Sequence, residues 1–163
     1  MWATQYIDLN EKKRFITSGG LGTMGFGFPA AIGAKIGCPD KEVICITGDG
    51  GFQMNIQEFA TAMCQETNII VCVLNNYYLG MVRQIQQLFY GKRYEATCLK
   101  RRKACPPRCA SGKRIEKEEE ILPALQWARE QQTPVVLEFM IATEEIVLPM
   151  VKSGNPMSEM ILK

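Results

Sequence analysis

The sequence predicts an α/β fold in which a parallel sheet carries helices on both faces. Three short, continuous apolar runs, at residues 43–47, 68–74 and 133–142, are typical of strands that are buried on both sides. Segments with helical periodicity lie between these runs, so consecutive strands are joined by helical crossovers. Buried strands joined in this way form right-handed βαβ units of a parallel sheet. We expect residues 1–163 to form a single domain, since this length allows a sizeable core.

The first half of the chain predicts two helices around the first strand. Residues 19–27 are rich in glycine, and the small residues after them predict a closely packed helix at 28–37. Beyond the strand, Asn55 is a candidate N-cap, and Glu58 three residues later completes an N-terminal signature. A helix is therefore expected at 55–65.

The second half of the chain predicts two further helices and a loop. A helix should begin after Gly80, and its apolar face would consist of Met81, Ile85, Leu88 and Phe89. A basic, cysteine-rich loop is expected at 98–114. A charged, amphipathic helix at 116–131 then precedes the third strand.

The composition excludes several classes of function. The chain contains no histidine, which rules out any triad or metal site built on imidazole. No apolar run approaches the roughly 18 residues of a membrane-spanning helix, and no signal peptide is visible. The seven cysteines are an odd number, and four of them (Cys38, Cys45, Cys64 and Cys72) lie in or beside apolar runs, where we expect small buried side chains. A cytoplasmic location follows.

The positive charge is concentrated in one segment. Residues 92–117 carry a net charge of +8, against −6 for the rest of the chain. Within this segment Cys98, Cys105 and Cys109 could suggest a zinc site, but their spacing lacks a fourth ligand. The neighbouring basic residues could suggest nucleic acid, but no aromatic residue is interleaved with them. A solvated loop is the favoured interpretation, without a nucleic-acid partner.

Polar residues follow two neighbouring strands at the point where each strand ends. Gly48-Asp49-Gly50 follows the first strand, and Asn75-Asn76 follows the second, one helical crossover later. Ligands of parallel α/β sheets bind at this edge. Oxygen donors of this kind suit Mg²⁺ or Ca²⁺, and a glycine-rich helix start suits an anion. A metal-bridged diphosphate is therefore predicted, although Asp49 alone could merely cap a helix or form an Asx turn.

The pairing of GDG with NN after one crossover matches the thiamine diphosphate motif. Nearly the whole chain resembles the C-terminal cofactor-binding domain of acetolactate synthase (acetohydroxyacid synthase) catalytic subunits. The resemblance is carried by MWATQY, TSGGLGTMGFGFPAAIGAKIG, GDGGFQMNIQEFATA, LNNYYLGMVRQ, LFYGKRYEATC and VLPMVKSG. It implies the thiamine diphosphate-binding fold, with thiamine diphosphate and Mg²⁺ as cofactors.

The resemblance also implies roles for individual residues. Asp49 and Asn76 would be side-chain ligands of the metal, and the backbone carbonyl of Tyr78 a third ligand. Met24 would keep the two cofactor rings in a bent conformation, and Met81 would lie near the thiazolium. These two methionines are the catalytic candidates, with ordinary core packing as the alternative. The implied cofactor-binding residues are Gly22, Met24, Gly48, Asp49, Gly50, Gly51, Asn76, Tyr78, Gly80 and Met81.

The resemblance implies an activity and a set of partners. Members condense two pyruvates, or pyruvate and 2-ketobutyrate, with release of CO₂ in branched-chain amino acid biosynthesis. The activating glutamate belongs to a separate N-terminal pyrimidine-binding domain, so the isolated chain should be inactive. FAD is held mainly by a middle domain and is not expected to bind this chain alone. A homo-oligomer is expected, and a regulatory subunit is a possible further partner.

The chain departs from the family pattern in three places. A glutamine-rich turn that precedes MWATQY in the family is missing, so we expect a domain truncated at its N-terminus. A helix resembling PDFVKLAEAYG is replaced by the basic segment, and a sheet without that helix would leave apolar surface bare. Either the basic segment covers this surface, or the sequence omits or scrambles a piece. Ile85 stands where the family usually has tryptophan. Two alternatives therefore remain: the cofactor subunit of a two-chain 2-keto-acid decarboxylase, and a non-catalytic domain remnant.

The residue at position 85 leads to a prediction about inhibitors. Sulfonylurea-type inhibitors of the family stack on the tryptophan, so a full-length enzyme with Ile85 should bind them poorly. Ile85→Trp should increase sensitivity roughly tenfold, the effect of one added aromatic contact. Inhibition of both full-length forms measures this, and equal sensitivity would refute it.

Overall fold

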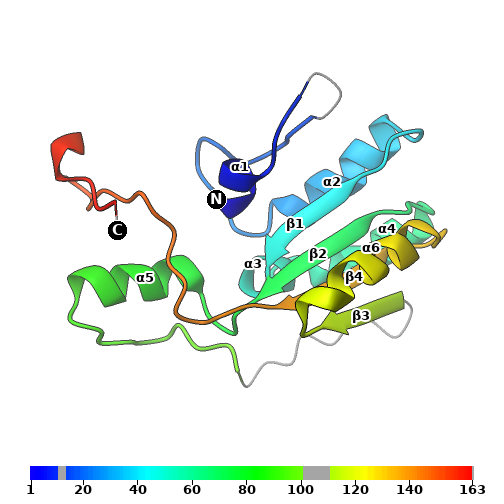
Figure 1. The fold of residues 1–163 in the computed structure, drawn as a ribbon. Coiled ribbons are helices and arrows are strands. Elements are labelled where there is room, and N and C mark those ends of the chain that lie inside the picture. The colour runs from blue at the N-terminus through cyan, green and yellow to red at the C-terminus, as the bar shows by residue number, and fades with distance from the viewer. Residues whose placement is uncertain (11–13, 101–110, 163) are drawn as a thin grey trace.

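The centre of the molecule is a parallel sheet of four strands, in the order β1-β2-β4-β3 (Figure 1). The computed structural model describes residues 1–10, 14–100 and 111–162. The strands are β1 (Ile44–Gly48), β2 (Ile70–Asn75), β3 (Ser111–Ile115) and β4 (Val135–Met140). The predicted fold class, a parallel sheet with helices on both faces, is confirmed.

One face of the sheet is covered by the helices on either side of β1. These are α2 (Gly27–Gly37), α3 (Asp49–Gln53), η1 (Ile56–Glu58) and α4 (Phe59–Cys64). Three phenylalanine rings, Phe28, Phe52 and Phe59, lie with their centroids 5.1, 5.4 and 6.1 Å apart. Burial of each ring contributes roughly 2–3 kcal/mol. The cluster therefore anchors α2, α3 and α4 against β1 and β2.

The opposite face is covered by η2 (Glu118–Glu120) and α6 (Ile121–Arg129). Its core combines side chains of α6 with alternate side chains of three strands, namely Ile70, Cys72, Ile115, Ala124, Ala128, Val135 and Leu137. The register of β1 places Ile44 and Ile46 on this face, beside Ile70 and Cys72. These two isoleucines remain 44% and 41% exposed. The bare apolar surface of the sheet therefore lies on β1.

The prediction of a loop at 98–114 is wrong at its C-terminal end, because β3 occupies Ser111–Ile115. Residues 101–110 lie outside the described part of the chain. No apolar run marks β3, since an edge strand can be polar wherever no helix covers it. Arg114 of β3 pairs with Glu138 of β4 at 2.8 Å, which makes this part of the sheet polar.

The prediction of one helix at 55–65 with Asn55 as its N-cap is also wrong. The helical path begins earlier, at Asp49, and is divided into α3, η1 and α4. The Asn55 side chain caps no helix. Its Nδ2 donates instead to the carbonyl of Gly25, 30 residues away, at 2.9 Å. Asn55 thus forms a tertiary hydrogen bond instead of the helix cap that the local sequence predicted.

Helix α5 (Gly80–Phe89) forms as predicted, but its apolar face does not enter the core. Met81 and Ile85 are 38% and 37% exposed, whereas the buried residues of the helix are Arg83 and Gln84. Figure 1 shows α5 beyond the carboxyl edge of the sheet, beside the segment that follows β4. The shorter helices α1 (Trp2–Tyr6) and η3 (Met157–Glu159) lie near the two ends of the chain.

Of the four cysteines expected to be buried, two are buried and two are exposed. Cys45 and Cys72 are buried, and burial raises their pKa to about 11 and about 12, so both thiols are protonated and unreactive at neutral pH. Cys38 and Cys64 are exposed because they stand at the C-terminal ends of α2 and α4. Among the residues that the structure describes, no helix has the length and apolar character needed to cross a bilayer.

Candidate functional site

The carboxyl ends of β1 and β2 lie side by side, as the crossover predicted. Gly48 is in register with Leu74, so Asp49 and Asn75 leave the sheet at the same level. The backbone N–H of Tyr77, which donates to Asn75 Oδ1, lies close enough to the Asp49 carboxylate to lower its pKa. The structure therefore brings Asp49 against the loop that contains Asn76 and Tyr78.

Asp49 is a buried carboxylate without a cation. Its exposed fraction is 7%, and none of the three ion pairs among the described residues includes it. Burial raises its pKa to about 6, although the nearby backbone N–H groups of Gly50, Asp49 and Tyr77 act to lower it. The nearby Glu138 carboxylate raises the pKa slightly further. A buried anionic group of this kind would be stabilised by a bound cation.

The loop after β2 is held in a tight conformation by its own side chains. Asn75 Oδ1 accepts the N–H of Tyr77 at 2.8 Å, and Asn76 Oδ1 accepts the N–H of Tyr78 at 3.0 Å. Tyr77 has φ +62°, in the left-handed region that side chains other than glycine rarely adopt. Each asparagine thus holds the backbone two residues ahead of it.

The loop is also paired with the segment around Cys98. Leu79 N–H donates to Thr97 O at 2.8 Å, and Leu99 N–H donates to Tyr77 O at 2.7 Å. These bonds form an antiparallel bridge between Tyr78 and Cys98. The carbonyls of Tyr77 and Thr97 accept the two hydrogen bonds of this bridge. The Tyr78 carbonyl accepts neither of them.

Asn75 has a structural role, because its side chain joins the end of β2 to a charged residue of β4. It is 3% exposed, and its Nδ2 donates to Glu138 Oε1 at 2.6 Å. Glu138 Oε2 in turn accepts from Arg114 Nε at 2.8 Å. This polar chain runs beneath the loop and supports it. The sequence feature that could have indicated these partners was the single glutamate within the otherwise apolar strand VVLEFM.

The glycine-rich segment reaches the same edge of the sheet. Gly25 has φ +88°, and a Cβ there would lie 2.6 Å from Asn55 Nδ2, so glycine is required on both counts. The hydrogen bond from Asn55 fixes this segment near the start of η1. Gly22 also has a left-handed φ, of +62°.

Gly50 is the point where the segments of the site converge. A Cβ at this position would lie 2.8 Å from Leu79 Cδ2, 3.3 Å from Leu99 Cδ1 and 3.5 Å from Met24 Cε. At Gly51 a Cβ would lie 3.1 Å from Thr47 Oγ1. A side chain at either position would therefore be crowded by neighbouring side chains of the same chain. This is a different reason from the approach of a phosphate that the sequence suggested.

The two methionines singled out from the sequence are not core residues. Met24 is 45% exposed and Met81 is 38% exposed. Gly80, which begins α5 ahead of Met81, would place a Cβ 3.3 Å from Asn76 Nδ2. The start of α5 thus lies directly against Asn76.

The donors at this edge suit a hard divalent cation better than a soft one. Within residues 1–10, 14–100 and 111–162, no group of three or more His, Cys, Asp or Glu side chains is placed to hold a metal. A cation here would depend on the Asp49 carboxylate together with amide and backbone oxygens, which fits Mg²⁺. Of the three cysteines considered for zinc, Cys98 is exposed, and Cys105 and Cys109 lie outside the described residues.

Comparisons with known proteins agree with the resemblance seen in the motifs. The family model "Thiamine pyrophosphate enzyme, C-terminal TPP binding domain" matches residues 1–139. The acetolactate synthase large subunit of Corynebacterium glutamicum is 45% identical over 98% of this chain and 27% of its own length. The isozyme 2 large subunit of Escherichia coli K12 is 40% identical over 100% of this chain and 30% of its own. The chain thus spans less than a third of these relatives.

A solved structure shows the same fold. The thiamine diphosphate-dependent 4-hydroxybenzoylformate decarboxylase of Rhodococcus jostii RHA1 superposes with a TM-score of 0.67. The match has 23% sequence identity and covers 77% of this chain and 24% of the decarboxylase. At this identity the likeness concerns the fold alone.

The burial of Asp49 leads to a prediction about stability in the absence of metal. Because its pKa in the folded chain is about 6, above the ordinary 3.8, the unfolding free energy should fall as the pH rises through this window. Asp49→Asn should therefore raise the unfolding free energy at pH 7 by about 1–3 kcal/mol, and the gain should disappear below about pH 4.

Denaturant unfolding of the unaltered chain and of Asp49→Asn in EDTA, at pH 7 and below about pH 4, measures this difference. Asp40→Asn, in an exposed turn, serves as the control and should change little at either pH. A loss of stability in Asp49→Asn at pH 7 would contradict the prediction.

Proposed function

Because the chain belongs to the thiamine pyrophosphate enzyme family, as a C-terminal TPP-binding domain, we propose that it binds thiamine diphosphate through Mg²⁺ within an acetolactate synthase. The observation that carries this proposal is the buried Asp49 carboxylate, which has no cation partner among the described residues and contacts the loop after β2. The identity of 40–45% to acetolactate synthase large subunits supports the choice of enzyme.

Three oxygen donors would hold the magnesium ion. They are the side chains of Asp49 and Asn76 and the backbone carbonyl of Tyr78. Asn76 Oδ1 accepts a hydrogen bond from the N–H of Tyr78. The same oxygen has a second lone pair that could bind a metal. Mg²⁺ commonly combines one or two carboxylates with phosphate oxygens. The remaining positions would therefore be filled by the diphosphate and by water.

The residues around Gly50 would hold the diphosphate of the cofactor. Gly48, Gly50 and Gly51 form the backbone turn that would face the diphosphate, and Gly80 sets the start of α5 beside it.

The exposed methionines would line the reaction site. Met24 is partly exposed next to Gly50 and is suited to support the cofactor rings, with the Gly22 carbonyl available to the pyrimidine. Met81 would shield the opposite side from water. Thiamine diphosphate, when bound, supplies the electron sink for decarboxylation of a 2-keto acid. The residues of this chain orient the cofactor and exclude water from it.

The activity of the complete enzyme is proposed from its relatives. The reaction would condense pyruvate with a second 2-keto acid in branched-chain amino acid biosynthesis, in the cytoplasm. A pyrimidine-binding domain and an FAD-type domain would complete each subunit, in a homo-oligomer that a regulatory subunit could join. These parts lie outside a chain that spans 27–30% of its acetolactate synthase relatives.

Calorimetry tests the cofactor-binding proposal. The chain should bind thiamine diphosphate with Mg²⁺ and not with EDTA. Asn76→Ala should weaken binding at least about tenfold, the effect of losing one charge-assisted contact, whereas Asn155→Ala at an exposed position should not. Binding should also weaken below about pH 6, because protonation of Asp49 competes with the metal. No binding by the unaltered chain at neutral pH would instead support the domain remnant.

A turnover assay tests the dependence on other domains. The purified chain should produce no acetolactate from pyruvate with thiamine diphosphate and Mg²⁺, because the activating glutamate implied by the family belongs to another domain. Acetolactate above the protein-free control would show that these residues suffice.

A further inference from the structure

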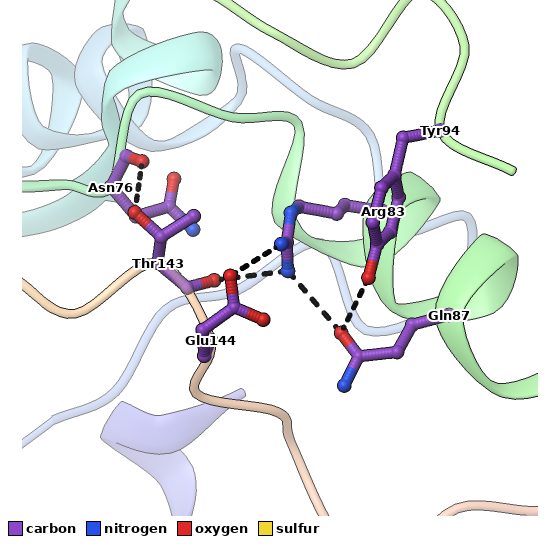
Figure 2. Close-up of polar contacts among 6 residues, drawn as sticks. All are labelled: Asn76, Arg83, Gln87, Tyr94, Thr143 and Glu144. Atoms are coloured by element: carbon purple, nitrogen blue, oxygen red, sulfur yellow. Dashed lines mark hydrogen bonds and ion pairs between the residues drawn. The ribbon is translucent and has the colours of Figure 1, made fainter. Parts of the chain in front are cut away.

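Arg83 of α5 packs against two tyrosine rings, at the junction of three segments. Its side chain is only 8% exposed, and its Cζ lies 4.4 Å from the ring centroid of Tyr94 and 5.0 Å from that of Tyr78. Figure 2 shows the guanidinium beside Tyr94 and pointing toward the segment that follows β4. Such stacking restricts the plane of the guanidinium.

The guanidinium binds the segment at 143–150, here named the strap. Nη1 donates to the backbone carbonyl of Thr143 at 3.3 Å, and Nη2 pairs with Glu144 Oε1 at 2.6 Å (Figure 2). The next residue of α5, Gln84, donates to Val147 O at 2.8 Å and accepts from Val147 N at 2.7 Å. Gln84 Nε2 also donates to Met150 Sδ at 3.1 Å, so five hydrogen bonds join one turn of α5 to the strap.

The strap in turn contacts the candidate metal loop. Thr143 Oγ1 donates to the backbone carbonyl of Asn76 at 3.4 Å (Figure 2). The Tyr78 ring lies against the Arg83 guanidinium. Both loop residues proposed as metal ligands therefore contact either Arg83 or the residue whose carbonyl Arg83 binds.

Stability alone is a weak reason for this arrangement. The Glu144 side chain is 73% exposed, so solvent screens its ion pair with Arg83 and the pair contributes little to stability. The Nε atom of Arg83 is buried without a partner in the described part of the chain, which is unfavourable. An apolar side chain of similar volume would fill the space beside the rings at comparable stability. The guanidinium differs from it by fixing the directions of its contacts.

We propose that Arg83 is a positioning residue that holds Asn76 and Tyr78 in the geometry for Mg²⁺ by fixing the strap against their loop. This inference rests on the proposed function and extends it to a residue that contacts neither the metal nor the cofactor. It predicts that loss of the guanidinium loosens the loop and weakens cofactor binding without a matching loss of global stability.

Hydrogen exchange on the metal-free chain tests the inference directly. In Arg83→Met the amides of Tyr77, Tyr78 and Leu79, all hydrogen-bonded in the structure, should exchange on the order of tenfold faster, while the denaturation midpoint changes little. Arg83→Lys keeps the charge but loses the planar fork of donors. Its loop amides should therefore exchange at rates between those of the unaltered chain and those of Arg83→Met. Arg129→Met removes an exposed ion pair with Glu42 and should leave loop exchange unchanged.

Calorimetry provides the second measurement. Thiamine diphosphate with Mg²⁺ should bind Arg83→Met about tenfold more weakly, and Arg129→Met with unchanged affinity. Unchanged loop exchange in Arg83→Met, or an increase spread evenly over the chain, would overturn the inference. Absence of cofactor binding by the unaltered chain would overturn the proposed function alone, because the exchange result does not depend on the cofactor.

Discussion

The parallel pairing of β1 with β2 is the constraint on which the candidate site depends. Gly48 lies opposite Leu74, so the residues that follow each strand leave the sheet together, and Asp49 meets the backbone of Tyr77. The valines of β2 point into the phenylalanine cluster in this register. A slip by one residue would turn them to the other face. The packing of the β2 valines in the apolar core therefore fixes the positions of the polar residues at the carboxyl edge of the sheet.

The site itself is costly to the folded chain. Asp49 is buried with a pKa of about 6, and Tyr77 is held in the left-handed region. Such features persist only when the surrounding structure holds them in place. Here the support comes from the chain of Asn75, Glu138 and Arg114 beneath the loop and from the bridge to Cys98 beside it. A bound cation would relieve the electrostatic part of this cost.

Helix α5 reverses the usual orientation of an amphipathic helix. Its polar residues Arg83 and Gln84 are buried, and its apolar residues Met81 and Ile85 are partly exposed. The reason lies in its neighbour, because the strap offers backbone carbonyl and N–H groups rather than an apolar sheet. Buried backbone groups need hydrogen-bonding partners. The helix therefore turns its polar face inward and leaves its apolar side chains partly exposed.

The sequence by itself determined the parallel α/β class, three of the four strands and the convergence of Asp49 with the loop at Asn76. These follow from continuous apolar runs and from the length of one crossover, which are local properties of the chain. Only the tertiary structure decided the edge strand β3, the bond from Asn55 to Gly25 and the burial of Arg83. Each of these depends on a partner far away in the sequence, and periodicity carries no information about which distant group will satisfy a polar side chain.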